Sequence, residues 1–120
     1  PTRNGKPITT SPRSELKDAV VTIGFSKSKE AMDAGMERYR SVAYQVRKTR
    51  MMGSAALALA YIACGRLDAY IEEQISLWDI AAGQLLVEAA GGTIRLSNSV
   101  SHPDKWGIVA DNGKLPLDDI

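Results

Sequence analysis

Short apolar segments suited to β-strands alternate along this chain with segments of helical periodicity, and this alternation restricts the fold more than any other feature. The predicted strands cover residues 19–25, 47–52 (a strand or an extended link), 67–72, 93–96 and 107–110, and the predicted helices cover 28–46, 54–64 and 76–90. Strands that alternate with helices are typical of α/β proteins. We therefore predict a layered α/β sheet with helices packed on it and right-handed crossovers.

The two longer apolar patterns predict which helix faces are buried. In the first helix, apolar residues recur at helical spacing and should pack on the sheet. They are Met32, Met36, Tyr39 and Ala43. The helix at 54–64 is apolar nearly all round, so we expect it to be sandwiched between two layers.

Composition restricts the class of protein. At 120 residues with 44% hydrophobic content, the chain is large enough for one domain with a core. Its single cysteine, Cys64, excludes an internal disulfide and a cysteine-based zinc cluster. No signal peptide is visible, and the longest apolar run, residues 55–64, is too short to span a bilayer. We expect a cytoplasmic protein without a membrane partner.

The charge is unevenly distributed. Residues 1–50 carry eleven Lys and Arg against five Asp and Glu, whereas residues 51–120 carry four against nine, giving the net charge of +1. The basic run at 38–50 could attract phosphates, but a solvated helix face explains it equally well. We expect nucleic acid not to be a partner.

The start of the chain suggests a piece of a longer polypeptide. The chain begins at Pro1 rather than at Met, and Asn4-Gly5 predicts a hairpin turn with only three residues before it.

Two regions near the C-terminal end of the chain give little information about function. His102 is expected to be an exposed bystander, and residues 114–120 to begin a further element.

Two carboxylates flank the junction between the third strand and the helix that follows it. Asp79 lies in the first turn of that helix, and Ser76 with Asp79 fits a capping box, so capping alone could explain it. The small residues after it leave room for a ligand, and the neighbouring Trp78 is expected either in the core or walling off solvent. Glu72 ends the strand, on the face opposite the core-facing Leu67 and Ile71. It is either a surface glutamate or an acceptor for sugar hydroxyls.

Residues 53–55 open the apolar helix. The backbone N–H groups of Gly53, Ser54 and Ala55 could bind a phosphate or hydroxyl oxygen, although Ser54 could equally be a plain N-cap. The sequence contains no Ser-His-Asp or Cys-His arrangement, no Walker loop and no GxGxxG, so we assign no catalytic residue within this chain.

Several motifs together resemble the C-terminal half of the inositol monophosphatase family. They are Trp-Asp-Ile-Ala-Ala-Gly at 78–83, Glu-Ala-Ala-Gly-Gly at 88–92, Gly-Ser-Ala-Ala-Leu-Ala-Leu-Ala-Tyr at 53–61, Gly-Arg-Leu-Asp-Ala-Tyr at 65–70 and Asn-Gly-Lys-Pro-Ile at 4–8. The resemblance implies a Mg²⁺-dependent, lithium-sensitive phosphomonoesterase acting on inositol monophosphate or a similar small phosphorylated polyol. It implies that Asp79 is a metal ligand, and that Gly53, Ser54, Ala55 and Glu72 contact substrate.

The family's remaining metal ligands lie on an N-terminal half, and its acidic motif does not occur here. We therefore expect residues 1–120 to be a single C-terminal α/β domain of a two-part phosphatase, inactive by itself and partnered by the missing half, with a homodimer as the implied assembly. The alternatives are a fructose-1,6-bisphosphatase, a histidinol-phosphatase, a nucleotide 3′-phosphatase, or a non-catalytic binding protein of the same fold.

Overall fold

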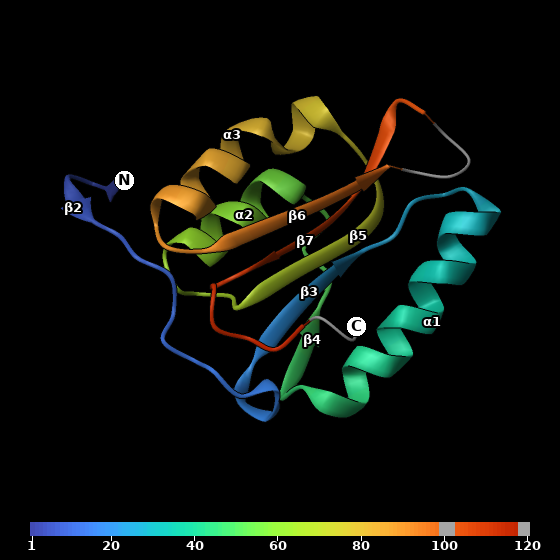
Figure 1. Cartoon of the computed structure of the whole chain (residues 1–120), viewed down its shortest axis with the longest axis horizontal. Coiled ribbons are helices and arrows are strands. Elements are labelled where there is room, and N and C mark those ends of the chain that lie inside the picture. Colours follow the sequence, from blue (N-terminus) through green and yellow to red (C-terminus); the bar gives the residue numbers. More distant parts are fainter. Residues whose placement is uncertain (99–102, 118–120) are drawn as a thin grey trace.

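A computed structural model of the chain describes residues 1–98 and 103–117 and contains the predicted alternation of strands and helices (Figure 1). The elements are β1 (Thr2–Arg3), β2 (Lys6–Pro7), the 3₁₀ helix η1 (Leu16–Asp18), β3 (Val20–Gly24), α1 (Lys29–Gln45), β4 (Lys48–Arg50), α2 (Ala55–Ala63), β5 (Ala69–Ser76), α3 (Leu77–Ala89), β6 (Thr93–Asn98) and β7 (Lys105–Asp111). From β3 onward the observed order is the predicted one. His102 and residues 118–120 lie outside the described part. β7 begins at Lys105, two residues before the predicted strand at 107–110.

Five strands form one mixed sheet in the order β4-β3-β5-β7-β6. Strand β3 pairs in parallel with β4 and with β5, while β7 runs antiparallel between β5 and β6. The chain leaves β3 toward β4 through α1 and returns across β3 to β5 through α2. Because both crossovers take the same hand, this reversal places α1 and α2 on opposite faces of the sheet.

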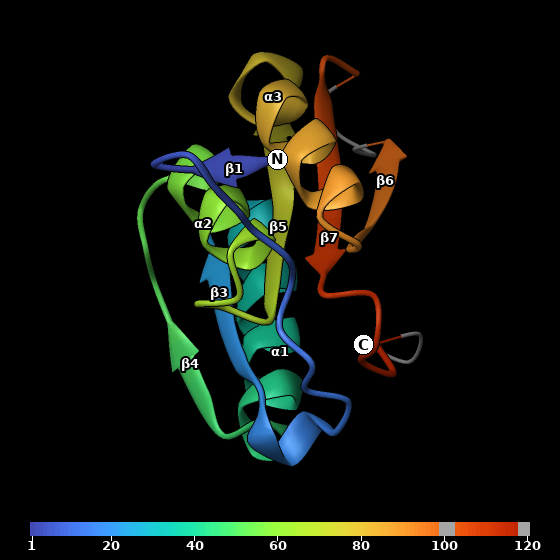
Figure 2. The same ribbon diagram turned by 90° about the vertical axis from the view of Figure 1, so that its left-hand side faces the viewer.

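The sheet is the middle of three layers, with α1 on one face and α2 and α3 on the other (Figures 1 and 2). Each face has its own apolar core. On the α1 side the strand residues include Val21, Ile23 and Ile71, and on the α2–α3 side they include Tyr70 and Ile108. Within the described residues, no helix is both long enough and apolar enough to cross a membrane.

The face of α1 that packs on the sheet agrees with the prediction at Tyr39, which packs against the core, but differs at Met32, Met36 and Ala43, which are exposed. Its buried positions are Ala31, Gly35 and Val42. Met32 and Met36 are 37% and 52% exposed. Gly35 lies against Phe25, where a Cβ atom would come within 2.9 Å of the ring. Small residues therefore allow a close approach of the helix to the sheet, and the larger methionines lie on the outer surface.

Tyr70 and Ile71 of β5 lie in the cores on opposite faces of the sheet, but Leu67, expected on the face of Ile71, belongs to the core that contains Tyr70. The first three residues of the strand are all buried. Asp68, just before the strand, is also fully buried. Its carboxylate accepts hydrogen bonds from the Ser11 hydroxyl, from Arg13 at 3.1 Å and from the backbone N–H of Val20 at 2.7 Å. This carboxylate anchors the segment before β3 at the amino end of the sheet, and helices on both faces leave β5 no solvent side.

The predicted hairpin turn at Asn4-Gly5 is present. Strands β1 and β2 pair antiparallel around it, and both turn residues adopt positive φ, 53° at Asn4 and 79° at Gly5. Two successive positive φ values define a tight type I′ turn, which favours the Asn-Gly sequence. All residues of this hairpin are exposed.

Candidate functional site

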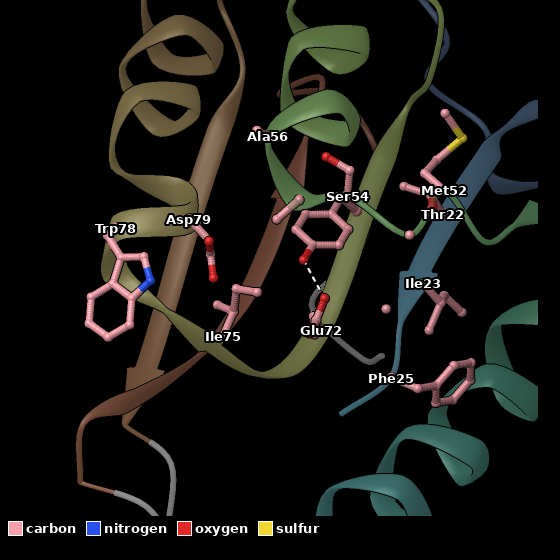
Figure 3. A pocket seen from close by; sticks show the side chains of 14 residues that line it. Thr22, Ile23, Phe25, Met52, Ser54, Ala56, Glu72, Ile75, Trp78 and Asp79 are labelled. Atoms are coloured by element: carbon pink, nitrogen blue, oxygen red, sulfur yellow. Dashed lines mark hydrogen bonds between the residues drawn. The ribbon is translucent and has the colours of Figure 1, made fainter. Parts of the chain in front are cut away.

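A pocket of about 460 Å³ lies at the carboxyl ends of β3 and β5, beside the first turns of α2 and α3 (Figure 3). Its lining residues are Thr22, Ile23, Gly24, Phe25, Met52, Gly53, Ser54, Ala55, Ala56, Tyr70, Glu72, Ile75, Trp78 and Asp79. All five residues predicted from the sequence to bind substrate or metal are among them. The fold therefore assembles on one pocket residues that come from three separate parts of the chain.

The strand order explains why the pocket is here. The connection that leaves β3 passes over one face of the sheet, and the connection that leaves β5 passes over the other. A crevice opens between the carboxyl ends of two parallel strands at such a reversal, and this is where open α/β sheets bind ligands.

The start of α2 forms one wall of the pocket. Gly53 has φ +73°, a conformation that favours glycine, and Ser54 follows it as the N-cap of the helix. The Ser54 hydroxyl accepts a hydrogen bond from the backbone N–H of Leu57 at 3.2 Å. Ser54 is thus a helix cap that also lines the pocket, so the predicted N-cap is confirmed, while binding of a phosphate or hydroxyl oxygen at this helix start stays a prediction.

The start of α3 forms the opposite wall. Asp79 lies in the first turn of this helix, with its side chain at the pocket. The predicted capping box is wrong, because Ser76 makes no side-chain cap bond and instead accepts a hydrogen bond from Lys105 Nζ at 2.6 Å. Trp78 is not a core residue; it is 80% exposed, and Lys105 Nζ lies 5.7 Å from its ring centroid.

Glu72 points into the pocket from β5 rather than into bulk solvent (Figure 3). The Tyr70 hydroxyl, two residues earlier on the same face of the strand, donates a hydrogen bond to Glu72 Oε1 at 2.5 Å. The pairing with β7 shifts register between Glu72 and Ile75, so the strand bends just where it meets the pocket.

The electrostatics of the pocket follow from burial and from the two carboxylates. Burial raises the pKa of Glu72 above its usual value, and the nearby Asp79 charge adds to this, while the Tyr70 hydrogen bond and Lys105 oppose it. The pKa of Tyr70 is raised by burial and by the Glu72 carboxylate, so the phenol keeps its proton. The pocket therefore offers acceptor oxygens whose negative charge suits a cation or hydroxyl donors.

Carboxylate oxygens are suitable ligands for Mg²⁺, and Asp79 is exposed enough to coordinate one. In the part of the chain that the structure describes, however, no group of three or more His, Cys, Asp or Glu residues is placed to hold a metal ion. The donors present are of the right kind for Mg²⁺ but too few to hold it without further ligands.

Sequence reasoning missed several lining residues of the pocket, and two of them, Tyr70 and Gly24, contact or adjoin Glu72. Period-two alternation in β5 already places Tyr70 on the face of Glu72, and this signal could have identified it. Gly24 pairs with Glu72 across the β3–β5 ladder, a relationship between distant segments that no local pattern shows.

The basic run at 38–50 does not reach the pocket. Arg38 forms an ion pair with Glu73 at 3.0 Å, and the remaining basic residues are exposed. They are Arg40, Arg47, Lys48 and Arg50.

Comparison with known proteins gives consistent matches. A model of the inositol monophosphatase family matches residues 2–116. The chain is 43% identical over 94 residues to inositol monophosphatase 3 of Solanum lycopersicum, covering 76% of this chain and 35% of that protein. It is 41% identical over 92 residues to the Nus factor SuhB of Xylella fastidiosa, covering 76% of this chain and 34% of that protein.

Solved structures agree with these matches. The inositol monophosphatase from Anabaena (Nostoc) sp. PCC 7120 superposes with a TM-score of 0.81 at 36% identity, covering 94% of this chain and 46% of that one. The Mycobacterium tuberculosis SuhB structure superposes with a TM-score of 0.77 at 36% identity, covering 87% of this chain and 40% of that one. The chain thus spans about a third of the length of these curated relatives and less than half of these solved structures.

Proposed function

Because the chain belongs to the inositol monophosphatase family, we propose that it is the substrate- and metal-contributing C-terminal half of a Mg²⁺-dependent phosphomonoesterase. The substrate would be inositol monophosphate or a similar small phosphorylated polyol. One observation carries the proposal: Gly53, Ser54, Ala55, Glu72 and Asp79 line a single pocket.

Each wall of the pocket would take a different part of such a substrate. The free backbone N–H groups at the start of α2 suit phosphate or hydroxyl oxygens. The Glu72 carboxylate, an acceptor, suits the hydroxyl groups of the polyol. Asp79 would hold Mg²⁺ beside the phosphoryl group. The bound ion would supply polarisation of that group and activation of water.

The residues described here supply too few metal ligands for this chemistry, so the remaining ligands would come from a second part of the full-length protein. Leucine side chains are exposed on α2 and α3. Leu57, Leu85 and Leu86 are 40%, 71% and 37% exposed there, although α2 was expected to be covered on both sides. We propose that the missing half covers this apolar face and completes the metal site. Lithium sensitivity and a homodimer remain predictions of the resemblance.

The test is phosphate release by the full-length protein. Replacing Asp79 with Asn should lower kcat and Mg²⁺ affinity by at least about tenfold, since loss of even an outer-shell partner of a metal ligand costs about 10–100-fold. Asp33→Asn, on the outer side of α1 and away from the pocket, is the matched control. Wild-type kinetics in Asp79→Asn would refute the ligand role. Release of phosphate by the 120-residue chain alone in Mg²⁺ would refute the need for a second half.

A panel of phosphomonoesters, including fructose 1,6-bisphosphate, histidinol phosphate and nucleotide 3′-phosphates, would separate the other substrate classes.

A second role, as a macromolecule-binding protein of this fold, is supported by the exposed basic residues of β4 and its neighbours, which lie apart from the pocket. Binding of nucleic acid that weakens steeply with salt, and is lost on replacing Lys48 and Arg50, would favour that role.

A further inference from the structure

Tyr70 is a buried phenol whose hydroxyl ends in the pocket. It is 2% exposed, and its ring belongs to the apolar core under α2 and α3. Within the described residues, its hydroxyl is the side-chain donor to the Glu72 carboxylate, at 2.5 Å from Oε1. Because core packing fixes the Tyr70 ring, its hydroxyl stays in one place when the Glu72 carboxylate rotates. The hydrogen bond therefore favours the one orientation of the carboxylate that keeps Oε1 at the hydroxyl.

Gly24 restricts the same carboxylate from the other side. It pairs with Glu72 across the parallel strands β3 and β5. A Cβ atom at Gly24 would lie 1.9 Å from Glu72 Oε1 and 2.6 Å from its carboxyl carbon. The backbone φ of Gly24 is not positive, so glycine is needed here for space and not for conformation. Glu72 Oε1 is therefore enclosed between the Tyr70 hydroxyl and the Gly24 backbone.

The enclosure leaves the second oxygen, Oε2, to accept hydrogen bonds from a molecule in the pocket. An ionised carboxylate oxygen accepts from hydroxyl groups and repels a second anionic group, and the Asp79 charge nearby strengthens that repulsion. We infer that Tyr70 is a positioning residue that, together with Gly24, holds Glu72 as an oriented acceptor, so that the pocket selects phosphomonoesters whose alcohol carries a neighbouring hydroxyl group. This inference rests on the proposed function.

The test compares two substrates with the full-length protein. Glycerol 2-phosphate carries hydroxyl groups on both carbons beside the phosphorylated carbon, and isopropyl phosphate has the same skeleton without them. In Tyr70→Phe, KM for glycerol 2-phosphate should rise about tenfold, the scale of a lost hydrogen bond to a charged group. KM for isopropyl phosphate and kcat for both substrates should stay unchanged. The preference for the hydroxylated substrate then falls about tenfold.

Two further variants separate positioning from structure. Tyr39→Phe removes a phenol that hydrogen-bonds Thr49 away from the pocket, and it should leave the substrate preference unchanged. Gly24→Ala keeps the phenol but displaces the carboxylate, and it should reduce the preference as Tyr70→Phe does. An unchanged preference in Tyr70→Phe, or an equal loss for both substrates, would overturn the inference.

Failure of the proposed function would look different. In that case the wild-type protein would release phosphate from neither substrate. The positioning role of Tyr70 would then be tested by measuring the pKa of the Glu72 carboxyl group by NMR titration. Because the Tyr70 hydrogen bond lowers the pKa of Glu72, Tyr70→Phe should raise it. An unchanged Glu72 pKa would show that Tyr70 does not orient the carboxylate.

Discussion

Gly83 of α3 lies directly against Leu59 of α2, so closely that a Cβ atom at Gly83 would come within 2.6 Å of Leu59 Cβ and Cδ1. Both residues are buried. The contact sets the separation of two helices whose first turns form opposite walls of the pocket. The geometry of the site thus depends on a packing contact outside it.

Gly83→Ala should therefore destabilise the chain by about 1–3 kcal/mol, because the extra methyl group forces the helices apart. Urea unfolding of the 120-residue chain measures the change. The neighbouring Gln84→Ala, on the same helix, should shift the midpoint little. A Gly83→Ala variant more stable than wild type would show that higher helix propensity outweighs the contact.

The buried Asp68 carboxylate should be a large contributor to stability. Asp68→Ala leaves Ser11, Arg13 and the Val20 N–H without their shared acceptor, and the loss should be about 3–5 kcal/mol, as for other broken buried ion pairs. Chemical denaturation checks it, with the exposed Asp18→Ala as control. Equal unfolding midpoints for the two variants would contradict the anchoring role.

Glu72 should make stability depend on pH. Its pKa in the folded chain is raised, so folding favours the protonated carboxyl. The resulting stability is fully present below the unfolded pKa and is lost as pH rises through the folded pKa. Glu72→Gln cannot ionise, so it should raise Tm at about pH 7 and leave Tm nearly unchanged at about pH 4.

Thermal melts at the two pH values test this, and Glu88→Gln, exposed on α3, should show no such pH dependence. A lower Tm for Glu72→Gln than for wild type at neutral pH would mean that the ionised carboxylate stabilises the fold. Burial would then not be the dominant influence on this group.

The apolar face of α2 and α3 should behave differently in the chain and in the full-length protein. Leu85 is 71% exposed here, so Leu85→Lys should alter the stability of the 120-residue chain by less than about 0.5 kcal/mol. In the full-length protein the same change would bury a charge, and Tm and activity should both fall. Equal effects in the two proteins would show that the missing half covers another surface.

Much of the fold was predictable because local signals agree with it. The Asn4-Gly5 turn and the Ser28 and Ser54 helix starts are each decided within a few residues. The predicted face of α1 was wrong at its methionines, however, because Gly35 packs on Phe25 while the more hydrophobic Met36 is exposed. Hydrophobicity alone does not show which side of a helix fits closely against a sheet.

The sequence by itself determined the order of elements from β3 onward, the family resemblance and five of the residues that line the pocket. Periodicity, capping and turn propensity act over a few neighbouring residues, so these features can be read along the chain. Only the tertiary structure decided that Asp68 is buried, that Ser76 bonds Lys105 rather than capping its helix, and that Gly24 and Tyr70 enclose the Glu72 carboxylate. Most of these relationships depend on strand order, which brings residues from distant segments into contact, and such contacts leave no local pattern in the sequence.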